Sequence, residues 1–149
     1  MIADMNLKAA QEVAESLGKD NAVAVSIDVT SEEQIKSALS EAVLAFGGVD
    51  LVVNNAGLSI SKPLLDTTQK DWDLQHDVMA RGSFLVSREA TKILIDQKLG
   101  GDIVYISSKN SVFAGPNNIA YSAAKADQAH QVRLPVSYTH LTLPTNREV

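Results

Sequence analysis

Cysteine is absent from this chain of 149 residues, so it forms no disulfide and no thiolate metal site. Long apolar runs are also missing, which argues against a membrane-spanning helix. The N-terminus lacks a basic stretch followed by an apolar one, so no signal peptide is predicted. The net charge of −5 provides no basic field that would attract nucleic acid or an anionic membrane. We therefore expect a cytoplasmic protein with neither kind of partner.

What the chain does have is a 45% apolar composition, enough for the core of one ordinary domain. Helical and strand periods alternate along it, which predicts an α/β fold with a parallel sheet. Ser31 is the expected N-cap of one helix, and Gln34 is placed to close a capping box. The expected strands are 1–3, 22–27, 49–53 and one ending at Ser108; the expected helices are 7–17, 35–46, 69–98 (one helix, or two meeting near Gly82) and 119–134.

Residues 135–149 have neither a helical nor a strand period. Two interpretations are open: a flexible terminus, or foreign sequence joined to a truncated gene. We favour the second, because the change of character after the preceding helix is abrupt. The domain is therefore expected to cover residues 1–134, with 135–149 as an irregular tail.

The most informative residues are Tyr121, Lys125 and Ser108. Tyr121 and Lys125 stand four positions apart on an expected helix, so they share one face. A neighbouring ammonium favours the phenolate and lowers the pKa of the phenol, which suits general acid–base chemistry. Ser108 lies thirteen residues upstream of Tyr121, at the end of a strand. A phenol, an ammonium and a hydroxyl together fit the movement of a proton to or from an alcohol oxygen.

These residues belong to a larger set of motifs that occur in a fixed order. The set comprises Asp28-Val29 after one strand, Asn54-Asn55-Ala56-Gly57 after the next, Ser108, and Tyr121-x-x-x-Lys125. In this order and spacing the chain closely resembles the short-chain dehydrogenase/reductase family over about residues 1–134. The resemblance implies a Rossmann-type, doubly wound parallel sheet and a nicotinamide cofactor. It also implies hydride transfer between a small alcohol and its carbonyl.

The resemblance further implies a role for each matched residue. Tyr121 would be the general acid or base, Lys125 would lower its pKa and hold the nicotinamide ribose, and Ser108 would polarise the substrate oxygen. The other cofactor contacts would come from Asn54, Ala56 and Gly57 along a groove, and from Asp28 and Val29 beside the adenine. No metal is implied.

Asp4, at the end of the first strand, would accept hydrogen bonds from the adenosine ribose. A carboxylate there favours NAD over NADP, because it repels a 2′-phosphate. Plain structural alternatives stay open for both acidic residues. Asp28 could be an acidic group near a helix start, and so little strand precedes Asp4 that its register is weakly fixed.

The chain departs from the family pattern in three ways. The glycine-rich phosphate loop with its strand is missing, as are the segments after the tyrosine helix. We therefore expect a central fragment that is inactive alone. Met79 stands where the family has an asparagine that completes a proton relay, and a thioether is only a weak acceptor. Either the relay runs through water or another side chain, or turnover is impaired; plain helix packing is the simplest role for Met79.

Family topology places the absent strand in the middle of the sheet. The strands near 22–27 and 49–53 would then belong to separate halves with exposed inner edges, which is an aggregation hazard. We expect the chain alone to be poorly soluble or molten and to bind NAD weakly. The resemblance also implies a homo-oligomeric parent, with a partner-facing helix surface formed by Gly82, Val86, Ala90 and Ile93.

Two further motifs narrow the resemblance. The segments 107–111 and 115–118, with the absent relay asparagine, look like the dehydrogenase part of bifunctional rhamnulose-1-phosphate aldolase/alcohol dehydrogenases. That would imply a small hydroxyaldehyde or hydroxy acid as substrate. The competing hypothesis is a dinucleotide-binding sensor or scaffold without turnover, of which Met79 would be a symptom.

The remaining polar residues are expected to be structural. His76 and His130 sit on expected helices without metal-ligand spacing to other His, Asp or Glu residues. Glu32, Glu33 and Lys36 are typical of a solvated helix face.

Overall fold

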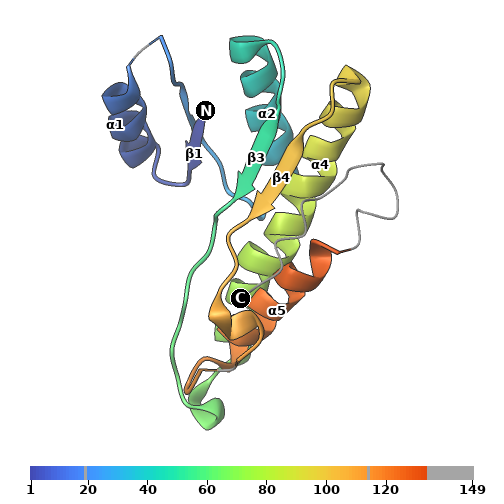
Figure 1. The fold of residues 1–149 in the computed structure, drawn as a ribbon. Coiled ribbons are helices and arrows are strands. Elements are labelled where there is room, and N and C mark those ends of the chain that lie inside the picture. The colour runs from blue at the N-terminus through green and yellow to red at the C-terminus, as the bar shows by residue number, and fades with distance from the viewer. Residues whose placement is uncertain (19, 114, 134–149) are drawn as a thin grey trace.

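The computed structural model describes residues 1–18, 20–113 and 115–133, in which short strands alternate with helices (Figure 1). In chain order the main elements are β1 (Ile2–Asp4), α1 (Leu7–Leu17), β2 (Ala24–Ser26), α2 (Glu32–Phe46), β3 (Leu51–Asn54), α3 (Gln69–Gln75), α4 (Gly82–Gln97), β4 (Asp102–Tyr105) and α5 (Ile119–Gln131). Three short helical segments are η1 (Leu64–Asp66), the π-helical η2 (His76–Arg81) and η3 (Lys109–Ser111). The predicted irregular tail, 135–149, lies outside the described residues.

The predicted α/β fold with parallel strands is confirmed, and its sheet is divided. β1 pairs with β2, and β3 pairs with β4, both in parallel. Among the described residues no strand pairing joins the two pairs. Figure 1 shows the β1–α1–β2 unit at the left, apart from β3 and β4 near the centre. The expected separation into two halves is therefore what the structure has.

One hydrophobic core holds the two strand pairs together. It is built from residues of the β2 segment, α2 and α4: Val25, Ile27, Ile35, Ala38, Leu39, Leu85 and Ala90. Val52 of β3 and Ile103 of β4 pack against the same cluster. The packing of α2 and α4 in this cluster therefore connects the two strand pairs, which no strand pairing among the described residues joins. None of the helices in the described ranges has the length and apolar character of a bilayer span.

The helix ends follow the sequence signals, with one exception. Ser31 caps α2 by accepting the backbone N–H of Gln34 at 3.4 Å, and Gly47, with φ of 81°, ends the helix. The predicted capping box is wrong, because Gln34 Oε1 accepts the N–H of Asp28 at 2.8 Å instead of reaching Ser31. The Gln34 side chain therefore fixes the loop between β2 and α2.

The predicted partner-facing surface on α4 is also wrong, because these residues face the core. Ala90 has no exposed area, and Val86 and Ile93 pack against the hydrophobic cluster. A Cβ added at Gly82 would stand 2.9 Å from Cγ2 of Val29. The small residues allow α4 to approach the rest of the chain closely, which is an intramolecular use of the same pattern.

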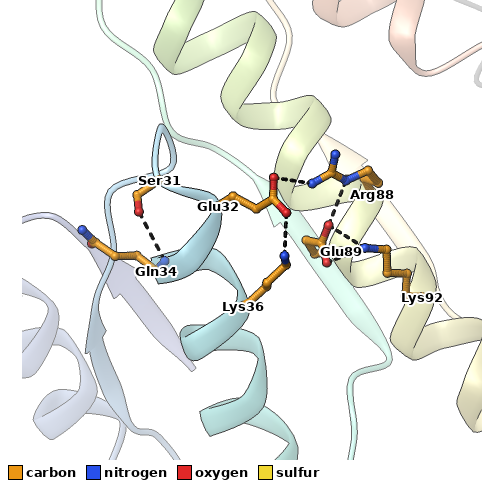
Figure 2. A network of polar contacts seen from close by, with 7 residues as sticks. All are labelled: Ser31, Glu32, Gln34, Lys36, Arg88, Glu89 and Lys92. Atoms are coloured by element: carbon orange, nitrogen blue, oxygen red, sulfur yellow. Dashed lines mark hydrogen bonds and ion pairs between the residues drawn. The ribbon is translucent and has the colours of Figure 1, made fainter.

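Charged residues also join α2 to α4, as Figure 2 shows. Glu32 pairs with Lys36 on its own helix and with Arg88 of α4, at 2.7 Å. Those two hydrogen-bonded cations lower the pKa of Glu32 to about 2. Arg88 and Lys92 also pair with the buried carboxylate of Glu89, both at 2.8 Å. Glu32 thus keeps a partly exposed side chain, in agreement with the predicted solvated face, and in addition joins the two helices.

Candidate active site

A cleft of about 390 Å³ lies where the carboxyl ends of β1 and β3 approach the start of α4. Ligands of open α/β sheets bind at the carboxyl ends of the strands, so the position suits a cofactor. Five of the residues predicted to contact the cofactor line this cleft: Asp4, Val29, Asn54, Ala56 and Gly57. The structure thus brings together positions spread over more than fifty residues of sequence.

Asp4 is exposed at the edge of the cleft. Its Oδ1 accepts the N–H of Asn6 at 2.8 Å, which fixes the carboxylate at the turn into α1. Within the described residues its Oδ2 has no hydrogen-bond partner. One carboxylate oxygen is therefore held by the turn, and the other is available to a ligand hydroxyl.

Asp28, Tyr121 and Lys125 were also predicted to contact the cofactor, but they do not line this cleft. Asp28 has a different set of contacts. Its Oδ1 accepts two hydrogen bonds from Thr30, from the backbone N–H at 2.8 Å and from the hydroxyl at 2.7 Å. These bonds, with the one from Asp28 N–H to Gln34, stabilise the connection that leads into α2. The structural alternative for Asp28 is thus supported by its contacts.

Tyr121 and Lys125 lie on one face of α5, as their spacing predicts. The Lys125 Nζ atom stands 5.9 Å from the centre of the Tyr121 ring. Lys125 is only 5% exposed, and this burial lowers the pKa of its ammonium. Nζ donates one hydrogen bond, at 2.7 Å, to the carbonyl oxygen of Ile106. An ammonium carries three donors, so two N–H groups remain for other acceptors near Tyr121.

Ser108 lies in the segment between β4 and α5 and caps η3. Its Oγ accepts the N–H of Asn110 at 3.2 Å, and its carbonyl oxygen accepts the hydroxyl of Ser111 at 2.7 Å. η3 packs against α5, and the bond from Lys125 to Ile106 joins α5 to the chain two residues before Ser108. The predicted trio is thus held on two connected segments, and no acceptor among the described residues takes the Ser108 hydroxyl hydrogen.

Met79 is fully buried within the π-helical η2. Its Cγ and Sδ stand 3.4 Å from the point where a Cβ on Gly57 would lie. Gly57 therefore leaves room for Met79 on one side while it lines the cleft on the other. The side chain packs below the loop that follows β3, as expected of a packing residue, and its thioether offers no donor.

Sequence reasoning missed a buried polar cluster below the cleft. Asn54 Nδ2 donates to Ser87 Oγ at 2.9 Å, and Ser87 Oγ lies 2.6 Å from the hydroxyl oxygen of Tyr105. Burial raises the pKa of Tyr105, an effect partly opposed by the Ser87 hydrogen bond. The available signal was Ser87 itself, a polar residue at helical spacing from the buried Ala90 and Leu94.

Within the ranges that the structure describes, no group of three or more His, Asp or Glu residues is arranged to hold a metal ion. The His76 ring stacks on Trp72, with ring centres 4.1 Å apart, and its Nδ1 bonds to the Trp72 carbonyl oxygen at 2.9 Å. The structural role expected for His76 agrees with these contacts.

With the fold and this geometry established, the chain can be assigned to a class of oxidoreductases. Residues 1–133 match the short chain dehydrogenase family. The chain belongs to that family, whose members use NAD or NADP. The fold supports the same assignment, since solved structures of the family superpose on most of the chain.

Two of those structures resemble the chain closely. Sorbitol-6-phosphate 2-dehydrogenase SrlD from Erwinia amylovora matches with a TM-score of 0.83 and 31% identity, over 87% of this chain and 52% of that one. A short chain dehydrogenase from Mycobacterium smegmatis matches with a TM-score of 0.84 and 29% identity, over 88% of this chain and 56% of that one. Both matches confirm the Rossmann-like fold.

Curated relatives point to the same class. The uncharacterized oxidoreductase YuxG of Bacillus subtilis is 47% identical over 137 residues, which are 89% of this chain and 20% of YuxG. The uncharacterized oxidoreductase C922.06 of Schizosaccharomyces pombe is 33% identical over 130 residues, 86% of this chain and 50% of the relative. The chain thus spans a fifth to a half of the length of these relatives.

Proposed function

We propose that the chain carries the proton-handling and cofactor-binding part of an NAD(P)-dependent oxidoreductase that interconverts a small alcohol and its carbonyl. The observation that carries this proposal is the placement of the buried Lys125 ammonium 5.9 Å from the Tyr121 ring centre, on the same helix face. An ammonium in that position stabilises negative charge on the phenol oxygen, as general acid–base catalysis requires.

The cleft has the chemical character that a dinucleotide needs. It combines one exposed carboxylate, amide side chains and a glycine that allows close backbone approach. Asp4 would accept ribose hydroxyls, while Asn54, Ala56 and Gly57 would line the groove. The bound nicotinamide would supply the chemistry of accepting or donating hydride.

The chain's own residues would handle the proton. Tyr121 would take the proton from the alcohol oxygen in one direction and return it to the carbonyl oxygen in the other. Ser108 would donate a hydrogen bond to the same substrate oxygen and hold it near the phenol. Lys125 keeps one donor on Ile106, and its other two donors would serve the ribose and a water that leads protons away.

The carboxylate of Asp4 supports NAD as the cofactor in preference to NADP. Asp4 Oδ2 has no partner in the described part of the chain, so it can accept from a ribose 2′-hydroxyl. A 2′-phosphate at that place would meet an exposed negative charge. The absence of cysteine supports a cytoplasmic location for such an enzyme.

A binding titration combined with a substrate panel tests the proposal. NAD and NADP are titrated into a full-length version of the protein, and NADH formation is followed with short hydroxyaldehydes, hydroxy acids and polyols. The expected result is NAD binding with turnover of at least one substrate. Binding without any turnover would favour the sensor or scaffold function, which the donor-free Met79 side chain supports. Failure to bind either dinucleotide would overturn both.

We further propose that the parent is a longer, bifunctional and homo-oligomeric protein of the aldolase/dehydrogenase type. Support for its length comes from YuxG, which is about five times longer than the segment that matches this chain. Reading the coding DNA on both sides tests the first part, since an aldolase coding region should lie upstream. Light scattering of the full-length product tests the second, and a monomer would contradict it.

A further inference from the structure

In the Asn54–Ser87–Tyr105 cluster, Ser87 and Tyr105 have no part in the proposed proton or cofactor steps, although polar side chains are costly to bury. Asn54 is 6% exposed and Ser87 is 7% exposed, and Tyr105 is half-buried. Buried amides and hydroxyls lower stability unless they are hydrogen-bonded, so a bonded cluster at one point calls for an explanation. Its three side chains come from β3, α4 and β4.

The position of this cluster is the end of a strand pair. In the parallel register of β3 and β4, Asn54 is opposite Tyr105, and this is the last matched pair. Both side chains meet the single hydroxyl of Ser87. Just beyond that pair, the Ile106 N–H donates to the carbonyl oxygen of Asn54, at 3.0 Å. Ser87 therefore holds the two strands at the point where their pairing stops.

The backbone of Ile106, which contributes to two successive peptide groups, connects this point to Lys125. Its N–H binds Asn54 on one side, and its carbonyl oxygen accepts from Lys125 Nζ at 2.7 Å on the other. A shift of the β4 end relative to β3 would displace the Ile106 backbone and move its carbonyl oxygen, the acceptor, away from the ammonium. The placement of Lys125 over Tyr121 thus depends on the separation of the two strand ends.

We propose that Ser87 and Tyr105 are positioning residues, which hold the carboxyl ends of β3 and β4 so that Ile106 can place the Lys125 ammonium beside Tyr121. The effect on catalysis rests on the proposed function. The positions of the strand ends and of Lys125 do not depend on any cofactor. Hydrogen bonding, rather than volume, carries the effect. An isosteric change that weakens the bonds should therefore release the strand ends.

Hydrogen exchange of the Ile106 amide in the full-length protein tests the structural content, because the 149-residue chain alone is expected to be molten. Ser87→Cys keeps the size of the side chain but bonds weakly, and Tyr105→Phe removes only the hydroxyl. Each should speed exchange at Ile106 by about tenfold, the size of one net hydrogen bond, without changing amides of the β1–β2 pair. Ser87→Thr, which restores a hydroxyl, should return protection toward the unaltered value. Ser40→Ala, which removes a helix hydroxyl bonded only to the Lys36 carbonyl oxygen, is the matched control.

Three results would overturn the inference: equal acceleration at all amides, unchanged exchange at Ile106, or no protection of Ile106 in the unaltered chain. A separate NAD titration of full-length variants keeps the two proposals distinct. Ser87→Cys and Tyr105→Phe should weaken NAD binding several-fold more than Ser40→Ala does. If the unaltered protein binds no NAD, the proposed function fails, whereas the exchange experiment still decides the role of Ser87 and Tyr105.

Discussion

The β1–β2 pair and the β3–β4 pair both consist of parallel strands connected through helices. They differ in whether the polar side chains at their carboxyl ends are exposed or buried. The first pair presents the Asp4 carboxylate to solvent at its carboxyl end, and its helix α1 buries only Ala10 and Ala14. The second pair ends in the buried Asn54 and the half-buried Tyr105, whose side chains both bond to Ser87 of α4. An exposed carboxylate can be exchanged with little effect on folding, whereas a buried cluster requires partners from several elements. The first half is thus suited to selecting a ligand, and the second to fixing reacting groups.

The sharpest test of the second half is Tyr121→Phe in the full-length protein. Removal of the phenol oxygen should lower kcat/KM by about 10²- to 10⁴-fold, the range for loss of a general acid or base. The NAD affinity should stay within about threefold, because the ring and Lys125 remain. NADH absorbance measures kcat/KM, and a fluorescence titration measures the NAD affinity. Retention of activity would remove Tyr121 from the proton step.

A change at the junction tests whether the two halves fold together. Ile35 has no exposed area and belongs to the cluster shared by both strand pairs, so Ile35→Ala should lower the free energy of unfolding by about 2–5 kcal/mol. Leu44→Ala, at an 85% exposed position of the same helix, is the control and should change it by less than about 0.5 kcal/mol. Urea denaturation measures both. A gradual loss of structure in the unaltered chain would agree with the expected molten state, and a sharp cooperative transition would contradict it.

The ligand-selecting role of the first half can be tested with Asp4→Ser. Loss of the carboxylate should weaken NAD binding by about tenfold or more and reduce the discrimination against NADP, since a charged hydrogen bond and a repulsive charge are both removed. Asp20→Ser, an exposed change in the same unit, serves as the control. Titrations with NAD and with NADP give the ratio of the two dissociation constants for each variant. An unchanged ratio would show that Asp4 does not face the ribose.

The smallest expected effect concerns α3, which lies in the second half. Asp71 bonds to Lys62 and Thr68, and these contacts lower its pKa from 3.8 to about 2. A lowered folded-state pKa means that the contribution to stability is complete above about pH 4 and disappears as the pH falls toward 2. Asp71→Asn should therefore be destabilising at about pH 6 and nearly neutral at about pH 2. Urea denaturation at the two pH values measures both, and Asp73→Asn, the same change on the same helix, is the matched control.

The sequence predicted the elements of both halves well, because burial sets their period. In α2 most residues at helical spacing are buried as the pattern indicates, namely Ile35, Ala38, Leu39 and Ala42. Val43 is half-buried, and Phe46, at the end of the helix, is exposed. The shared helix face of Tyr121 and Lys125 could also be predicted, because it depends on helix geometry alone. Five cofactor positions meet in one cleft because the carboxyl ends of parallel strands lie at one edge.

What the sequence could not predict are contacts that depend on how elements approach one another. The small residues of α4 fit a subunit interface and a tight internal packing equally well, and only the position of Val29 against Gly82 decides between them. Gln34 could close a box on Ser31 or reach Asp28, and the loop geometry selects Asp28. The bonds among Asn54, Ser87 and Tyr105 require three elements to be in place, so no local pattern encodes them.

The π-helical turn at His76–Arg81 determines which side chains of the following helix, α4, face the core. Such a turn contains one residue more than an α-helical turn, and each residue of a helix advances the side chains by about 100°. Deleting any single residue there would produce a more regular helix with better local bonding. It would also turn Ala90 away from the core and carry Ser87 out of reach of Asn54. The number of residues in this stretch is therefore set by the tertiary contacts of Ala90 and Ser87, although a regular α-helix would bond better locally. A one-residue deletion here should be harder to tolerate than most substitutions.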